Sequence, residues 1–187
     1  MLRNFVLVLV ATLMIGVVTE AHADEPPAQL SALAEQGDAA AQSELGWKYA
    51  KGDGVPQSYA EAVKWFRKAA DQGNVPAQIN LGVSYARGEG VSQDFAEAAK
   101  WYRRAADQGN GVAQNTLGGM YVQGQGVEQD YVQAYMWFHL AASTLVGPQR
   151  EVAVSERDLA AGKLTPEQLT RAQQMAQDWK PSTPSRQ

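Results

Sequence analysis

The fold is decided by "ADQGNVPAQINLGVSYARGEGVSQDFAEAAKWYRRA", residues 70–105, because the chain contains this unit three times. Aligned at a spacing of 36 residues and without any gap, the unit matches residues 34–69 before it and 106–141 after it. Similarity at such a period is typical of repeat proteins, in which each unit packs on its neighbours. We therefore expect a stack of three like units.

Each unit predicts two helices, and the first of them has clear ends. It is expected to begin after a short polar side chain that can accept from a free backbone N–H: Asp38, Asn74 or Asn110. It is expected to end at a glycine that can adopt the left-handed conformation: Gly52, Gly88 or Gly124. Between these ends an Ala-Leu-Tyr stripe follows one helical face, and its middle members are Leu45, Leu81 and Leu117.

The second helix of each unit is predicted from a capping box and an apolar face. The boxes are Ser58-x-x-Glu61, Asp94-x-x-Glu97 and Asp130-x-x-Gln133. The first helix of each unit has a glycine in its middle: Gly46, Gly82 and Gly118. A glycine in a helix interior costs about 1 kcal/mol of stability relative to alanine. Repetition of that cost predicts that the two helices approach closely there, so that Trp and Tyr rings pack beside bare backbone.

The Gly-x-Gly loops that follow the first helices allow two interpretations, a phosphate or cation site and a turn. They read "KGDGV" at 51–55, "RGEGV" at 87–91 and "QGQGV" at 123–127. A phosphate loop follows a strand and ends in Gly-Lys-Ser/Thr, whereas these loops follow helices. Ca²⁺ needs oxygen ligands at fixed places, but the middle residue changes from Asp53 to Glu89 to Gln125. The pattern favours turns.

The beginning of the chain predicts export. Arg3 is followed by an almost wholly apolar run and then by "TEAHAD", in which Ala21 and Ala23 are the small residues that a signal peptidase needs. We expect residues 1–23 to be removed, with the cut before Asp24, and the product to be periplasmic or secreted. The alternative is a membrane anchor, but the apolar run is shorter than the roughly 20 residues of a spanning helix.

Composition narrows the range of functions. The net charge of −4 argues against nucleic acid as a partner, and we expect no membrane association after signal cleavage. The chain has no cysteine and two histidines, so disulfides, thiol chemistry and the usual zinc sites are not expected. His139 aligns with Arg67 and Arg103, which predicts a surface position. We therefore expect no catalytic residues, no metal site and no cofactor.

The repeated pattern "A.QG...AQ..LG..Y..G.GV.QD...A..W...A" resembles the Sel-one-like repeat (SLR) family, relatives of tetratricopeptide repeats, over residues 34–141. The segment 164–179 is similar to the terminal helix that often closes such bacterial arrays. The resemblance implies an all-α fold, a right-handed α-solenoid of antiparallel helix pairs, and a role as an adaptor in envelope assembly or signalling. Some cysteine-rich relatives are credited with penicillin binding or weak β-lactamase activity; their cysteines are absent here.

The ends of the array require caps, because an end repeat otherwise leaves an apolar face in water. We expect a helix over residues 28–36, with Leu30 and Leu33 turned toward the first repeat. At the other end, Leu140 stands where Lys68 and Arg104 stand in the earlier copies, so it needs a cover. We assign this role to helices within 148–179. A single domain over 24–180 and a disordered tail at 181–187 complete the prediction.

A partner surface is predicted on the first helices, opposite the Ala-Leu-Tyr stripe, on the concave side of the solenoid. Residue types there vary between copies while the framework positions do not. The positions are Ser43, Trp47, Lys51, Ile79, Val83, Arg87, Asn115, Gly119 and Gln123. The sequence thus predicts a non-enzymatic adaptor or scaffold that binds a protein or peptide. The alternative is a cell-wall or penicillin-interacting hydrolase.

Overall fold

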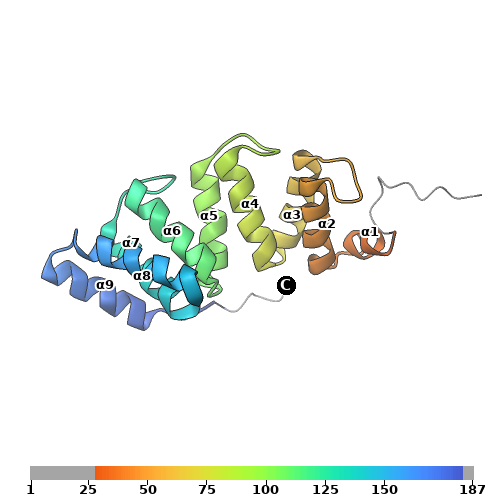
Figure 1. The fold of residues 1–187 in the computed structure, drawn as a ribbon. Helices are drawn as coiled ribbons and strands as arrows, with labels where there is room; N and C mark the ends of the chain where they lie inside the picture. Colours follow the sequence, from red (N-terminus) through yellow and green to blue (C-terminus); the bar gives the residue numbers. More distant parts are fainter. Residues whose placement is uncertain (1–27, 183–187) are drawn as a thin grey trace, which may run out of the picture.

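The computed structural model describes residues 28–182, which form nine α-helices and no strand (Figure 1). The predicted signal peptide and residues 183–187 lie outside the described residues. The helices are α1 (Ala28–Glu35), α2 (Ala39–Lys51), α3 (Tyr59–Asp71), α4 (Val75–Arg87), α5 (Phe95–Asp107), α6 (Gly111–Gln123), α7 (Tyr131–Thr144), α8 (Gly147–Ala161) and α9 (Pro166–Asp178). None of these helices is both long and apolar enough to span a membrane.

Three helix pairs, α2/α3, α4/α5 and α6/α7, follow one another along the molecule (Figure 1). Each first helix packs on the second helix of its own pair and, from α4 onward, on the second helix of the pair before it. A side chain on a second helix can therefore contact two repeats at once. The arrangement is the all-α solenoid that the repeat period predicts.

The helix ends agree with the predicted caps, with one difference. Asp38 accepts from the backbone N–H of Ala41 at 2.7 Å, and Gly52 closes α2 in the left-handed region at φ 72°. The predicted boxes at the second helices are one-sided. Ser58 accepts from the backbone N–H of Glu61, but the Glu61 carboxylate pairs with Lys64 at 2.6 Å instead of returning to the cap. Glu97 likewise pairs with Lys100, so in the first two boxes the carboxylate contacts a lysine instead of the cap.

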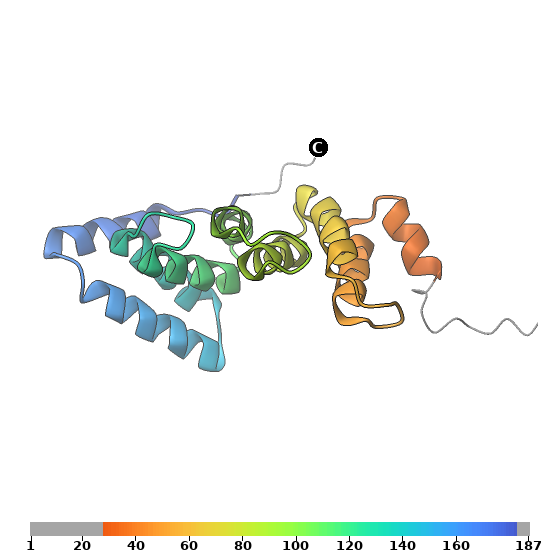
Figure 2. The same ribbon diagram turned by 90° about the horizontal axis from the view of Figure 1, so that it is seen from above.

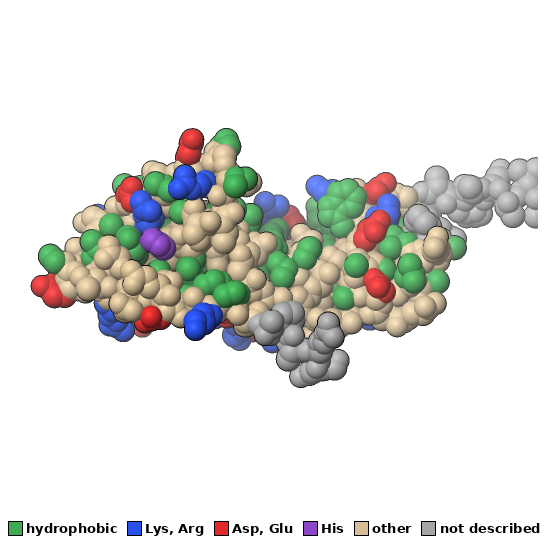
Figure 3. All heavy atoms as spheres, turned by 90° about the horizontal axis from the view of Figure 1, so that it is seen from below, with side chains coloured by type: hydrophobic (Ala, Val, Ile, Leu, Met, Phe, Trp, Pro, Cys, Tyr) green, Lys and Arg blue, Asp and Glu red, His purple; other side chains and the backbone are tan. Residues whose placement is uncertain are grey.

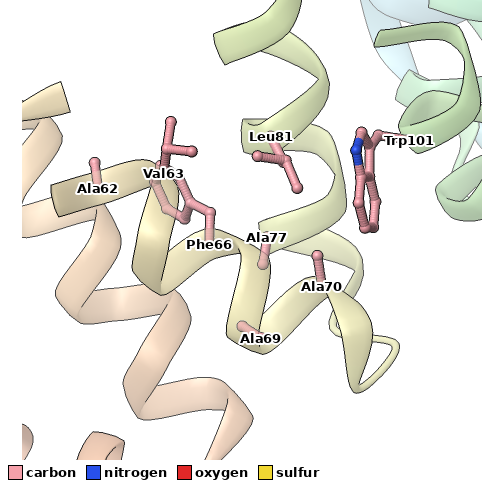
Figure 4. Close-up of a cluster of buried hydrophobic side chains, with 8 residues drawn as sticks. All are labelled: Ala62, Val63, Phe66, Ala69, Ala70, Ala77, Leu81 and Trp101. Atoms are coloured by element: carbon pink, nitrogen blue, oxygen red, sulfur yellow. The ribbon is translucent and has the colours of Figure 1, made fainter. Parts of the chain in front are cut away.

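The core is continuous from one repeat to the next. Figure 4 shows Phe66 of α3, Leu81 of α4 and Trp101 of α5 in one cluster, so the residues of a single repeat do not complete it. The mid-helix glycines lie where first and second helices approach. A Cβ on Gly46 would lie 2.7 Å from the Phe66 ring, and one on Gly118 would lie 2.7 Å from that of Phe138. Tyr102 packs at Gly82 as predicted, whereas the rings at the other two glycines are Phe and none of the three is Trp.

The Gly-x-Gly loops are turns that also hold neighbouring repeats together. Both glycines of each loop have positive φ. In the second and third loops the second glycine is set against the preceding helix pair: a Cβ on Gly90 would collide with the backbone carbonyl of Tyr59, and one on Gly126 with that of Phe95. After each loop a glutamine side chain donates to a carbonyl seven residues earlier; the pairs are Gln57–Ala50, Gln93–Ala86 and Gln129–Val122.

A second series of glutamines is buried between repeats. Each donates its Nε2 to a backbone carbonyl eight residues earlier; the pairs are Gln42–Ala34, Gln78–Ala70 and Gln114–Ala106. Gln72 and Gln108 in turn donate to the Oε1 atoms of Gln42 and Gln78, at 2.7 and 2.8 Å. Thr144 stands at the third such position, and Gln114 Oε1 has no partner among the described residues. This glutamine ladder satisfies backbone groups at the turns between repeats.

The N-terminal cap is α1, which packs Ala34 and Leu30 against the buried Leu45 of α2. Leu33 differs from the prediction because its side chain is 42% exposed. A helix of eight residues turns one face toward α2, and Ala34 and Leu30, four residues apart, occupy that face.

At the other end, α8 and α9 both pack on α7 and diverge from each other (Figure 2). Ala176 of α9 and Trp179, which follows the helix, share a cluster with Leu140, which is 7% exposed, so the α9 segment is the cover that Leu140 needs. Ser182, which the predicted tail includes, is held by the fold, because its N–H donates to the Asp107 carbonyl at 2.7 Å. Trp179 packs in the same cluster as Ala105 and Ala106, so residues 179–182 lie beside the end of α5.

Candidate interaction surface

The nine residues predicted to bind a partner lie on the first helices α2, α4 and α6, three on each. They form three rows, because positions 36 apart are equivalent: 43/79/115, 47/83/119 and 51/87/123. The last row is Lys51, Arg87 and Gln123, which are exposed on all three helices. Trp47 stands out in the middle row, because 46% of this large aromatic residue is exposed.

Other members of the predicted surface are less accessible than the helical pattern suggests. Ser43 is buried, at 8% exposure. Ile79 and Val83 are half-buried, and both pack against a cluster that contains Tyr102 and Met120. The prediction placed them opposite the packing stripe, but a first helix in the array also meets the next repeat. Two sides of the helix are therefore occupied, and Trp47, Ile79 and Val83 do not form one exposed strip.

The middle row lies beside the contacts between consecutive repeats, which we call junctions. At the junction of α4 and α5 with α6, Val83 and Met120 pack together with Tyr102 and Phe95. At the next junction, of α6 and α7 with α8, the residues equivalent to Val83 and Met120 are Gly119 and Glu156. A small residue and a charged one replace two apolar ones.

A pocket of about 240 Å³ occupies this last junction. Its walls come from α6, α7 and α8 together with Lys163; the residues are Gly119, Val122, Gln123, Tyr131, Phe138, Glu156, Leu159, Ala160 and Lys163. Two larger hollows are also present, of about 570 and 520 Å³. The first is lined by residues of α8 alone, so it is the open side of one helix. The second is lined by the loop between α6 and α7 with one residue from each of these helices. The smaller pocket is the one whose walls come from three helices.

His139 is not at the open surface that its alignment predicted. Its equivalents Arg67 and Arg103 lie across the junctions, where they donate to Tyr85 and Tyr121. His139 is half-buried, stacks on Tyr135 with ring centroids 6.0 Å apart, and lies near Arg157. Burial lowers the pKa of His139, and the Arg157 charge lowers it further. His139 lies on α7, a second helix, which packs on both α6 and α8. The side chain therefore faces a junction and not open solvent.

Several charged groups of the described residues form ion pairs, most of them between residues close in the sequence. Lys48 pairs with Asp53 at 2.9 Å, and Arg87 lies 3.7 Å from Glu89, so the acidic residue in two of the Gly-x-Gly loops pairs with a basic residue at the end of the preceding helix. Basic and acidic side chains are interspersed over the face shown in Figure 3. No group of three or more His, Cys, Asp or Glu side chains within 28–182 could hold a metal ion.

Comparison with known families decides what kind of array this is. The sequence profile described as "Sel1 repeat" matches three times, over residues 39–74, 75–110 and 111–143, which is more than half of the chain. The chain is a member of the Sel1 repeat family. Each match begins where a first helix begins, five residues later than the units read from the sequence, because the starting point of a period is arbitrary. Sel1 repeat proteins generally act in protein–protein interaction.

Solved structures agree with this membership. A protective antigen of uropathogenic Escherichia coli strains, displaying an SLR fold, is 41% identical with a TM-score of 0.71. The match covers 80% of this Sel1 repeat chain but 31% of the antigen. A Sel1 repeat protein from Oxalobacter formigenes is 40% identical with a TM-score of 0.62, over 68% of this chain and 96% of that one. A search of curated proteins gave no match.

Proposed function

We propose that this Sel1 repeat protein is a non-enzymatic adaptor that binds a protein or peptide on the first-helix surface, with Trp47 as an anchor. Trp47 is the observation that carries the proposal. It is 46% exposed in a helix whose Leu45 is 2% exposed, so packing within the repeat does not account for it. Large aromatic residues of this kind dominate the energetics of protein interfaces.

The other exposed residues of the first helices are suited to surround such an anchor. Lys51, Arg87 and Gln123 end α2, α4 and α6 at equivalent places, and they provide polar contacts of varied charge. Polar, solvent-accessible rims around an apolar centre are typical of interfaces. A partner that follows the concave side would meet one such set for each repeat.

Export to the periplasm or beyond is part of the proposal, with envelope assembly or signalling as the setting. It rests on the "TEAHAD" segment and the basic and apolar residues before it. The hydrolase alternative finds no support in the comparisons, which match interaction repeats.

The test is a cross-linked pull-down from periplasmic extract, read by mass spectrometry, with wild type and Trp47→Ala side by side. Trp47→Ala should keep the helical circular dichroism and bind the captured partner roughly thirtyfold more weakly, since an interface anchor is worth about 2 kcal/mol. Leu81→Ala is the control. Leu81 is fully buried, so this variant should lose about 2–5 kcal/mol of stability instead.

Two outcomes would contradict the proposal. If Trp47→Ala unfolds as readily as Leu81→Ala, Trp47 belongs to the core. If it folds normally and binds the same partner with unchanged affinity, the first-helix surface is not the binding site. Val83→Glu is not a clean second test, because Val83 packs on the cluster with Tyr102.

A further inference from the structure

The pocket at the last junction exists because this junction departs from the one before it. Val83, Met120 and Val127 are apolar and pack in one cluster at the earlier junction. The residues 36 positions later are Gly119, Glu156 and Lys163, and all three line the pocket. A Cβ built on Gly119 meets nothing within 4 Å, which is the space that a larger side chain would fill.

The pocket has apolar walls with one carboxylate among them. Phe138 is 1% exposed and closes the inner side, while Leu159 is 70% exposed and stands at the opening. Glu156 Oε2 is buried and has no hydrogen-bond partner within residues 28–182. Lys163 also lines the pocket, but no ion pair joins it to Glu156.

A buried carboxylate oxygen without a donor is unfavourable, since a charge taken out of water needs a partner. The donor that fits must cross an apolar region to reach it. Lysine and arginine side chains do this, because their aliphatic stems pack on apolar surface while the charged end finds a polar partner. The size also agrees, because about 240 Å³ is below the roughly 300–1,000 Å³ of ordinary small-molecule sites.

The geometry points to a receptor for one basic side chain: a lysine or arginine of the partner segment inserts between α6 and α8, with its stem against Phe138 and Leu159 and its charged nitrogen on Glu156. The inference rests on the proposed adaptor function and names the chemistry that the partner must present. Gly119 and Gln123 of the predicted surface line this pocket, so one partner segment can follow the first helices and place its basic residue here.

The experiment uses the purified ¹⁵N-labelled protein and measures amide shifts by NMR on titration with two probes. The first probe is n-hexylammonium, which carries the stem and charge of lysine, and the second is n-hexanol, its neutral counterpart. Two blocked pentapeptides, identical except for lysine or norleucine at the centre, repeat the comparison. Saturable shifts at Gly119 and Ala160 are expected with the cationic probes, at affinities at least tenfold higher than with the neutral ones.

Three variants locate the effect. Glu156→Gln keeps the shape and removes the charge, so the cationic probes should bind at least tenfold more weakly. Glu151→Gln, on the exposed side of the same helix, is the matched control and should leave binding unchanged. Gly119→Val combined with Glu156→Met restores two of the three apolar residues of the preceding junction, so it should keep the fold and abolish saturable shifts.

Equal affinity for hexylammonium and hexanol would overturn the inference, and so would undiminished binding by Glu156→Gln. Saturable binding by the double variant would show that the pocket is not the site. A failure of the basic-side-chain receptor can be told apart from a failure of the adaptor function. If the pull-down partner binds Glu156→Gln as tightly as wild type but loses affinity for Trp47→Ala, the adaptor function holds and the basic-side-chain receptor does not.

Discussion

At the scale of single residues, the surroundings of a side chain depend on the junction it faces. Gly118 and Gly119 are neighbours in α6, yet a Cβ on Gly118 would lie 2.7 Å from the Phe138 ring while one on Gly119 would meet nothing within 4 Å. Gly118 is required by the close approach of α6 and α7. Gly119 is not required by packing, and its small size opens the pocket beside it.

This difference predicts opposite effects for the same substitution. Gly118→Ala should destabilise the protein by about 1–3 kcal/mol, because the new methyl group overpacks against a buried ring. Gly119→Ala should stabilise it by up to about 1 kcal/mol, because alanine favours a helix and nothing obstructs its Cβ. Urea unfolding of both variants beside wild type measures the two values. Effects of the same sign would contradict the arrangement at α6.

The residues that sequence could assign are those whose role is the same in every copy. Leu45, Leu81 and Leu117 are predicted as core by their stripe, and all are at most 2% exposed. Ile79 and Val83 are less exposed than the helical pattern predicts, because they pack on α5 and also on Met120 of the following repeat, which a helical period within one repeat does not reveal. The pocket could have been found by comparing Val83 with Gly119 and Met120 with Glu156, that is, by reading equivalent positions as pairs across a junction.

At the scale of elements, α8 takes the place of a first helix in the 36-residue period, but α9 does not pair with it as a second helix. Val154 stands 36 residues after Gly118, at the place where the other first helices carry a glycine for close approach of their second helix. The loop before α9 is also shorter than the loops before α3, α5 and α7. The Val154 side chain packs against Ala141 and Ala142 of α7, and α9 covers α7 instead of packing on α8 as a regular second helix.

Removal of residues 148–187 therefore should expose the cluster around Leu140. Leu140 and Met136 are 7% and 5% exposed, and burial of such side chains contributes about 1.5–3 kcal/mol each. We expect a loss of at least about 3 kcal/mol and aggregation at concentrations that wild type tolerates. Removal of 183–187 should change little. Thermal unfolding followed by circular dichroism compares the three chains, and equal midpoints would show that α8 and α9 are not structural.

At the scale of the whole molecule, the repeated helix caps, stripes and turns predict the all-α array, and the resemblance of the repeated pattern to Sel-one-like repeats indicates the family; both are confirmed. The site was less predictable. Exposure of Trp47 and of the helix-end residues follows from the geometry of one helix, whereas the pocket needs three helices in place. The glutamine ladder was missed because glutamine in a helix carries no distinctive signal unless its position in the array is known.

Export is a property of the whole chain and has its own test. We expect expression in a Gram-negative host to give a periplasmic product that begins at Asp24, because the small residues Ala21 and Ala23 precede the cut. N-terminal sequencing and the intact mass of the periplasmic fraction measure this. A membrane-bound product that retains Met1 would contradict the prediction.

The glutamines have a consequence for how the array tolerates insertions and deletions. The ladder bonds reach back eight residues across the turn between repeats, and the loop glutamines reach back seven residues across the turn within a repeat. An extra residue in the turn between repeats would strand a buried amide, which is costly, and one in the turn within a repeat would break the loop bond. Length changes confined to one turn are therefore selected against. Such an array lengthens or shortens by gain or loss of a complete copy, which brings or removes its ladder and loop glutamines together.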